Sequence, residues 1–272
     1  MTETNAANGL DRPIEIADNI FWVGFHEQIS NFHCNPYLIV SGDEAVLIDS
    51  GSRPDFAVVM MKILQTGISP EQITTLIYQH SDPDLCGSMP NMIDLCKNPK
   101  LTILSEKDSN IFISYYIERG QQSLLRSIDD LGFAFTFGGG RVLTFFKTPY
   151  AHNAGSFVTY DQQTKTLFSS DIFGSFSQKW SLYLDLKEDC YTCNDYIHCM
   201  NNRDYCPIPD MLEFHKKVMP SEKALRYAMN IFRTLDIERI APQHGSVINK
   251  KADVSFLIEK LSSLQGVGID AF

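Results

Sequence analysis

The 272-residue chain lacks a long apolar run, a block of basic residues and an apolar targeting segment. A membrane-spanning helix needs roughly 20 mostly apolar residues, and no stretch approaches that length. Residues 1–12 are polar, which is not the pattern of a signal peptide. Lys and Arg total 23 against 33 Asp and Glu, so no basic face is available to bind phosphates. We therefore predict a cytoplasmic protein that binds neither membranes nor nucleic acid.

Internal repeats, low-complexity blocks and Pro/Gly/Ser-rich linkers are also absent. A chain of this length can fold around one core, particularly in β-rich and α/β classes. Its 44% hydrophobic content is ordinary for a globular protein. We predict a flexible segment over residues 1–12 and a single domain over residues 13–272.

Short β-like runs alternate with helical runs along the chain. Strand pairs in each half, each followed by helices, favour an α/β (α+β) protein in which two sheets pack together with helices outside. The predicted strands are 19–25, 35–40, 45–49, 73–78, 101–104, 141–146, 156–161, 166–170 and 240–243. The predicted helices are 56–65, 89–97, 110–128, 213–218, 221–235 with Ser221 as the N-cap, and 253–264.

Four of the predicted strands are followed, at or shortly after the C-terminal end, by His or Asp. Side chains in the loops beyond strand ends can converge on one rim, where α/β folds build sites. A single His or Asp after a strand is usually structural, so the prediction of a metal site depends on the joint pattern. Its members are His80, Asp82 and Asp84 after the first of these strands, His152 after the second, Asp171 after the third and His244 after the fourth.

The first three candidates are spaced by two residues. In extended backbone, this spacing puts His80, Asp82 and Asp84 on one face, and Pro83 disfavours a helix interior there. Such groups pointing one way would repel or stay poorly solvated unless a cation lay between them. The spacing therefore predicts an extended segment that binds a cation.

The joint pattern resembles the metal motif of the metallo-β-lactamase superfamily. Asp49-Ser50-Gly51 matches the early Asp-x-Gly element of that superfamily. The second motif position is usually His in hydrolytic members and a carboxylate in the flavodiiron branch, and here it is Asp82. The segment 219–247, with its Ile-Ala-Pro-Gln-His-Gly run, also resembles that branch, and most of all its stand-alone oxygen-binding diiron proteins (ODP). The resemblance covers residues 13–265.

This resemblance implies an αββα sandwich of two mixed sheets flanked by helices. It also implies two iron ions: the first held by His80, Asp82 and His152, the second by Asp84 and His244, with Asp171 bridging both. Independently, three imidazoles and three carboxylates suit iron or manganese better than a sulfur-rich zinc site, although zinc remains an alternative. Flavodiiron proteins carry a following flavodoxin-like domain. We expect neither that domain nor a bound flavin in a chain ending at Phe272.

One position departs from the resemblance. After Asp84 the family usually carries a ligating His, and this chain has Leu85, which cannot coordinate. We therefore predict an open position on the second metal, where a diatomic gas can bind. Two other parts of the chain could also face the site. Tyr150 could donate a hydrogen bond to a bound gas molecule, and Asn35-Pro36-Tyr37 precedes a strand and could point toward it.

The seven cysteines have an odd count and uneven spacing, which favours free thiols or metal ligands over disulfides. Four of them form one cysteine-rich stretch that is open to three interpretations: a structural zinc site with His198, a redox-active cluster, or free thiols. These four are Cys190, Cys193, Cys199 and Cys206. The remaining histidines, predicted to be structural or exposed, are His26, His33, His198 and His215.

Three functions fit the site. The first is a dioxygen sensor in signalling, by analogy in chemotaxis, with a signalling protein as partner. The second is an O2 or NO reductase, which requires an electron donor such as a rubredoxin- or flavodoxin-like protein. The third and least favoured is a metal-dependent hydrolase, because Asp82 and Leu85 depart from the hydrolytic pattern. Relatives are often homodimers, which we also expect here.

Overall fold

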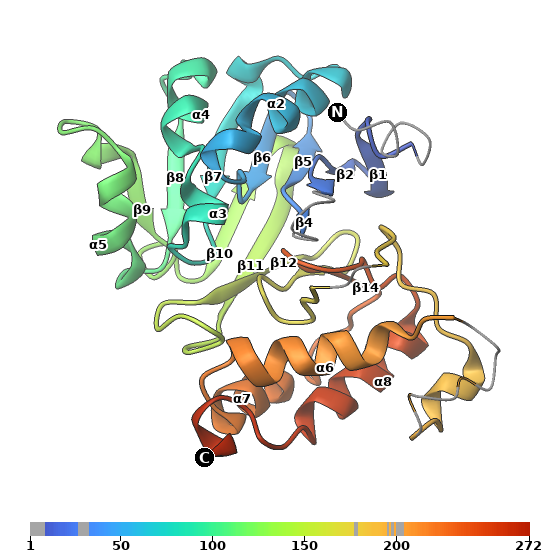
Figure 1. Ribbon diagram of the computed structural model, residues 1–272. Coiled ribbons are helices and arrows are strands. Elements are labelled where there is room, and N and C mark those ends of the chain that lie inside the picture. Colours follow the sequence, from blue (N-terminus) through green and yellow to red (C-terminus); the bar gives the residue numbers. More distant parts are fainter. Residues whose placement is uncertain (1–8, 27–32, 177–178, 195, 197–198, 200–203) are drawn as a thin grey trace.

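The computed structural model describes residues 9–26, 33–176, 179–194, 196, 199 and 204–272. Two β-sheets pack face to face, and helices cover the outer face of each sheet (Figure 1). This arrangement is the metallo-β-lactamase-type αββα sandwich that the sequence predicts.

The first sheet has seven strands. It is antiparallel from β1 to β6 and parallel from β6 to β9. In spatial order its strands are β1 (Ile14–Ala17), β2 (Ile20–Trp22), β5 (Tyr37–Ser41), β6 (Glu44–Ile48), β7 (Ile73–Ile77), β8 (Thr102–Ser105) and β9 (Leu125–Ser127).

The second sheet has five strands, antiparallel except for the parallel pair β13–β14. A separate two-stranded ribbon joins β3 (Phe25–His26) to β4 (His33–Cys34). In spatial order the five strands are β10 (Ala134–Phe137), β11 (Arg141–Lys147), β12 (Phe157–Asp161), β13 (Thr166–Phe168) and β14 (Arg239–Ala241).

Alternation along the strands divides the core into layers. Successive residues of a strand point to opposite faces. Val46 and Ile48 therefore join the buried cluster between the sheets, together with Phe145 of the second sheet. Ala45 and Leu47 join the cluster under the helices of the first sheet. Both faces of the first sheet are thus buried.

The outer helices also bury apolar residues against the two sheets. α2 (Phe56–Gln65) and α4 (Met89–Cys96) cover the first sheet, and α6 (Pro207–Val218), α7 (Glu222–Phe232) and α8 (Lys251–Ser262) cover the second (Figure 1). Helix α7 buries an apolar stripe spaced for one helical face. The Oγ of Ser221 accepts a hydrogen bond from the Ala224 N–H at 3.2 Å, which confirms the predicted N-cap.

Shorter helical turns complete the described part of the chain. They are α3 (Pro83–Cys86), α5 (Ser109–Ile113), η1 (Arg53–Asp55), η2 (Pro70–Gln72), η3 (Ser114–Tyr116), η4 (Gln122–Leu124), η5 (Gly138–Gly140), η6 (Glu188–Tyr191) and η7 (Ile269–Ala271).

The helix predicted over residues 110–128 is wrong. Only short turns form there, and the segment ends in β9, which pairs with β8. Gly120 has φ +105°, a left-handed conformation that interrupts a helix. Beyond it, Leu125 pairs with Ile103 at the edge of the first sheet. Long-range pairing therefore overrides the local helical pattern.

A buried ion pair within the second sheet also bonds to the first sheet. Arg141 on β11 donates to the Asp161 carboxylate on β12 at 2.8 and 2.9 Å, and to the Val40 carbonyl on β5 at 3.2 Å. Burial by itself would raise the pKa of Asp161, but the Arg141 guanidinium holds it below its usual range. The bidentate pair holds the Arg141 guanidinium in place, and the bond to the Val40 carbonyl connects the second sheet to the first.

A second buried cation fastens α2 to the N-terminal strands. The Nζ of Lys62 donates to the Leu10 carbonyl at 2.7 Å and to the Gly24 carbonyl, and lies 4.0 Å from the centre of the Trp22 ring. Burial lowers the pKa of Lys62 to about 7.

Among the helices in the described parts of the chain, none combines the length and the apolar content that crossing a bilayer requires.

Candidate metal centre

The six predicted ligands come from both sheets and meet at one edge of the sandwich. Four of them lie in the loops that follow β7, β13 and β14, or in the connection between β11 and β12, and two lie at the start of α3. Their ligand atoms form two groups. The loops beyond the strand ends therefore converge as the sequence predicts.

The first group contains His80, Asp82 and His152, with one ligand atom of each within 4.8 Å of the others. The Oδ2 of Asp82 lies 3.4 Å from the Nε2 of His152 and 3.8 Å from the Nε2 of His80. Two imidazoles and a carboxylate thus face a common point.

The second group contains Asp84, His244 and, in addition, Cys34. The Nε2 of His244 lies 3.1 Å from the Oδ2 of Asp84. Cys34 closes the β3–β4 ribbon and is buried. The sequence gives no sign of this candidate ligand, because an isolated cysteine in a two-residue strand carries no spacing motif.

Asp171 lies between the two groups. Its Oδ1 is 3.8 Å from the Nε2 of His80 and 3.9 Å from the Nε2 of His244, and its Oδ2 is 2.9 Å from the Nε2 of His152. One carboxylate therefore faces both groups, which is the geometry that a bridging ligand needs.

The predicted extended segment over His80–Asp84 is wrong in its second half. Pro83 begins the short helix α3, and Asp82 is its N-cap residue with φ −73° and ψ 151°. Proline fits the first helical position, where its missing N–H leaves no bond unmade. The turn directs Asp84 to the second group, so the three residues serve two groups rather than one face.

Two imidazoles are held by bonds at the nitrogen that faces away from the site. The Nδ1 of His244 lies 2.9 Å from the His33 carbonyl, and the Nδ1 of His80 lies 2.9 Å from the Ser170 Oγ. A carbonyl can only accept, so the Nδ1 of His244 carries a proton, and its Nε2 faces the Asp84 carboxylate in the site.

The electrostatics of the site call for a cation. Burial by itself would lower the pKa of His244, but the Asp84 carboxylate raises it well above its usual range. Burial would raise the pKa of Asp171, but the surrounding imidazoles, His80 foremost, hold it below its usual range. The Nε2 of His80 and the Oδ1 of Asp171 are buried and have no hydrogen-bond partner. Such groups are costly to leave unpaired, and a metal ion between them would satisfy both.

Asp49, from the predicted Asp-x-Gly element, supports the centre from outside. Its carboxylate accepts from the Gln79 backbone N–H at 3.2 Å and from the Gln79 side chain at 3.4 Å. Burial raises the pKa of Asp49 well above its usual range. These bonds fix the loop just before His80.

The other predicted site residues lie elsewhere. Leu85 is fully buried in the cluster under α2 and α4. Tyr150 is 59% exposed and lines an apolar groove with Pro220 and Tyr227. Asn35 and Tyr37 are buried and donate to backbone carbonyls of the loop that carries His244.

The cysteine-rich stretch forms no comparable group in the part of the chain that the structure describes. The thiols of Cys190, Cys193, Cys199 and Cys206 are half-buried. No three of their Sγ atoms lie within 4.8 Å of one another. His198 lies outside the described residues.

The remaining described histidines have structural contacts. His215 is buried, accepts from the Phe173 N–H at 2.9 Å and donates to the Met211 carbonyl at 2.7 Å. His26 and His33 stack on the Trp180 ring, with centroid distances of 5.1 and 4.9 Å.

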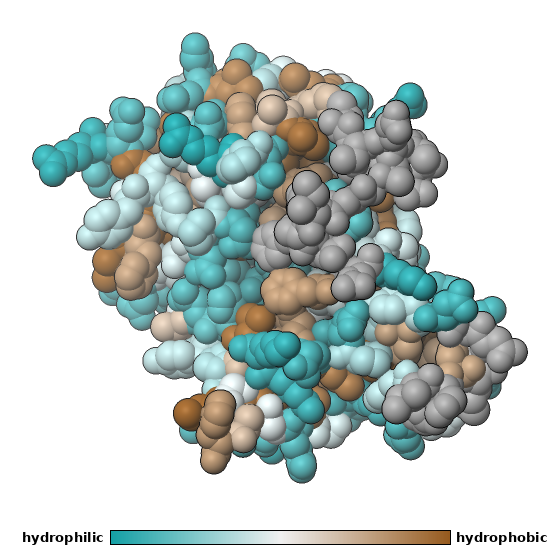
Figure 2. Space-filling model, in the orientation of Figure 1, coloured by the Kyte–Doolittle hydropathy of each residue, from teal (hydrophilic) through white to brown (hydrophobic). Residues whose placement is uncertain are grey.

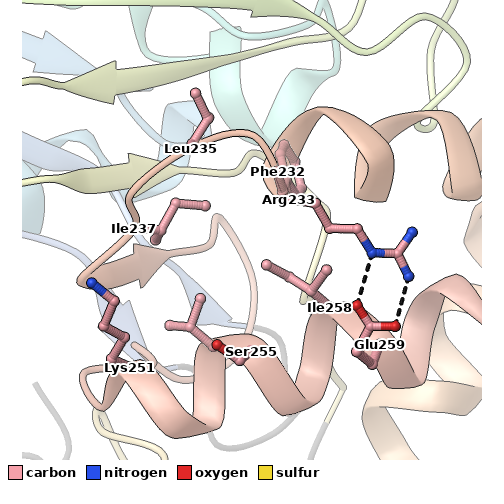
Figure 3. Close-up of a pocket in the computed structure, with 9 residues that line it drawn as sticks. Phe232, Arg233, Leu235, Ile237, Lys251, Ser255, Ile258 and Glu259 are labelled. Carbon is pink, nitrogen blue, oxygen red and sulfur yellow. Dashed lines mark hydrogen bonds and ion pairs between the residues drawn. The ribbon is translucent and has the colours of Figure 1, made fainter.

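A pocket away from the centre lies between the end of α7 and α8 (Figure 3). Arg233 and Glu259 form a bidentate ion pair across it at 2.8 and 2.7 Å. Hydrophilic residues cover most of the coloured part of the face in Figure 2, and hydrophobic residues lie scattered among them. The convergence of imidazoles and carboxylates around a buried Asp171 therefore distinguishes the metal centre from these surface features.

The model of the family described as ODP family beta lactamase matches residues 32–245. The chain belongs to this family. The match includes both ligand groups. The "Nitric oxide reductase" of Moorella thermoacetica is 26% identical over 89% of this chain and 59% of its own length. "Diflavin flavoprotein A 1" of Synechocystis is 32% identical over 52% of this chain, but over 23% of its own length. The chain thus spans little more than half of these relatives at most.

Solved structures agree on the fold. "Apo state of chemotaxis sensor ODP from T. denticola" matches with a TM-score of 0.74 and 23% identity, over 95% of each chain. "Peroxy diiron species of chemotaxis sensor ODP" matches with a TM-score of 0.73 and 23% identity. The rubredoxin oxygen:oxidoreductase of Desulfovibrio gigas matches with a TM-score of 0.73 and 20% identity, over 92% of this chain and 61% of that chain. These likenesses establish the αββα fold.

Proposed function

We propose that this chain is a non-haem diiron protein that binds dioxygen and acts as an oxygen sensor in signalling. The observation that supports this most directly is the pair of ligand groups that face one buried carboxylate, Asp171. The proposed role in signalling rests on the likeness to the chemotaxis sensor ODP, which extends over 95% of both chains.

In this proposal, His80, Asp82 and His152 would hold the first iron, Asp84 and His244 would hold the second, and Asp171 would serve both. Ferrous iron, when bound, supplies the electrons that dioxygen binding requires. The largely oxygen and nitrogen donor set suits iron or manganese. The three carboxylates offset part of the charge of the two cations.

The chain's own residues also control access and orientation. The Asp82 and His152 side chains are 36% and 23% exposed, whereas those of Asp171 and His244 are almost fully buried. A gas molecule would therefore approach from the side of Asp82 and His152. Ser170 and the His33 carbonyl hold two imidazoles in place from the opposite side.

The likeness to the Moorella nitric oxide reductase supports a second candidate, an O2 or NO reductase with an external electron donor. The two candidates share a site and differ in turnover. A sensor keeps its ligand, whereas a reductase consumes it while electrons are supplied.

Metal analysis and optical spectra of protein purified without oxygen test both candidates. The sensor predicts two irons per chain and a long-lived visible absorption band after O2 is added. Steady NADH-linked O2 consumption with a rubredoxin-type donor would instead favour the reductase. If the folded protein carries no transition metal, both proposals fail.

A further inference from the structure

We propose that the thiolate of Cys34 is a third ligand of the second metal, supplying the donor that Leu85 cannot. This inference rests on the proposed two-metal function and refines the composition of one half of the site.

The two halves of the centre have matching geometry once Cys34 is included. The Sγ of Cys34, an oxygen of Asp84 and a ring nitrogen of His244 lie within 4.8 Å of one another, as do the ligand atoms of the first group. Each half then has three donors of its own and shares Asp171. Without Cys34, the second half would have two.

An independent observation points to a cation at this position. The Oδ1 of Asp171 is 4% exposed at the residue level, has no hydrogen-bond partner, and lies 3.9 Å from the Nε2 of His244. A buried carboxylate oxygen without a donor is costly. A metal ion held by Cys34, Asp84 and His244 would satisfy it.

The position of Cys34 is fixed on both sides. On one side, the His33 carbonyl lies 2.9 Å from the Nδ1 of His244. On the other side, the Asn35 N–H donates to the Gln243 carbonyl at 2.9 Å, and the Asn35 amide donates to the carbonyls of Pro242 and Gly245. The two residues that flank Cys34 thus hold it against the loop that carries His244.

Close backbone packing holds the segment from behind. A Cβ at Gly24 would lie 2.1 Å from the Cys34 carbonyl oxygen, so only glycine allows the β3–β4 ribbon to close at this distance. The Sγ is therefore set in place by the fold before any metal binds, which reduces the ordering cost of coordination.

Coordination requires the thiol to lose its proton. The S–H bond breaks, an S–metal bond forms, and the proton passes to solvent, with no change in oxidation state. A thiolate is a softer ligand than carboxylate or imidazole. The second half of the site should therefore accept zinc or cobalt more readily than the all-nitrogen and oxygen first half.

Cobalt titration of the metal-free, reduced full chain tests this assignment. A thiolate ligand gives a sulfur-to-cobalt charge-transfer band in the near ultraviolet. We expect this band to grow with one of the two cobalt equivalents, to be absent in Cys34→Ser, and to remain in Cys96→Ser. Cys96 is a matched control because it is equally buried, in α4, outside both ligand groups.

Iron content gives a second readout. In Cys34→Ser, the second metal should bind at least about 100-fold more weakly. Losing a hydrogen-bond partner of a metal ligand already weakens metal binding by up to about 100-fold, and losing a ligand itself should cost no less. The first metal should remain bound. The assignment is overturned if the wild-type chain lacks the band, or if Cys34→Ser keeps it. Two tightly bound metals in Cys34→Ser would also overturn it, yet would leave the diiron proposal intact. Absence of metal from the wild-type chain would remove both.

Discussion

Replacing Asn35 with Asp would separate the role of one amide group from every effect of size. Asn35 is fully buried. Its Oδ1 accepts from the Trp22 indole N–H at 2.8 Å, and its Nδ2 donates to the Pro242 carbonyl at 3.0 Å and to the Gly245 carbonyl at 2.9 Å. Asn35→Asp keeps the acceptor and the volume but loses both Nδ2 donations.

The magnitude follows from the two lost donations. The Gly245 carbonyl loses its donor, which costs about 1–3 kcal/mol for a buried group. The Pro242 carbonyl keeps the Tyr37 hydroxyl as a donor at 2.9 Å, so that loss costs only about 0.5–1.5 kcal/mol. Asn35→Asp should therefore lower the free energy of unfolding by about 1.5–4.5 kcal/mol. This is a large fraction of a typical total of about 5–15 kcal/mol. The loop carrying His244 should also loosen, and the second metal should bind more weakly than the first.

Urea unfolding of the metal-free protein, followed by tryptophan fluorescence, measures the effect. Only two tryptophans are present, and Trp22 contacts Asn35 directly. Asn98→Asp is the control, because Asn98 makes the same kind of bond, to the Glu71 carbonyl at 2.6 Å, at a more exposed position. We expect it to change stability by about 0.5 kcal/mol or less. Equal stabilities of the two variants would refute the reasoning.

Three further changes test the Arg141–Asp161 ion pair, the hydrogen bonds of buried Lys62 and the shared carboxylate. Asp161→Asn leaves the buried Arg141 unpaired and should cost about 3–5 kcal/mol at neutral pH. Because pairing lowers the pKa of Asp161, its stabilisation is complete above the ordinary pKa of about 4 and is lost as the pH falls through the lowered value. The urea midpoints of wild type and variant should therefore converge in acid, and a constant gap would contradict the assignment. Lys62→Met leaves two buried carbonyls unpaired and should cost at least about 1–3 kcal/mol, so unchanged thermal unfolding would show that the contacts are unimportant. Asp171→Ala should abolish most iron binding without unfolding the chain, whereas Asp253→Ala, a buried carboxylate in α8, should retain it; full iron content in Asp171→Ala would exclude a bridge.

The sequence was sufficient for the parts of the site that follow strands. His80, His152, Asp171 and His244 each follow an apolar run that becomes a strand, and parallel or paired strands bring their ends to one edge. Their convergence was therefore predictable from spacing and resemblance together.

The remainder depends on contacts between distant segments. Cys34 lies beside His244 because the β3–β4 ribbon folds against the loop after β14, and no local pattern encodes that contact. The exposure of Tyr150 likewise depends on how the connection between β11 and β12 turns, as its φ of 62° indicates. The helix predicted over residues 110–128 is wrong for the same reason, since the last part of this segment pairs with β8.

The order of the ligands along the chain has a consequence for biosynthesis. A ribosome-bound chain that has emerged through Asp171 already contains every donor of the first group, whereas His244 emerges much later. The hydrogen-bond acceptor of Asn35, the residue next to Cys34, is the Gly245 carbonyl, which lies 210 residues downstream. The ligands of the first half can therefore come together before His244 has been synthesised, whereas the second half can close only after it.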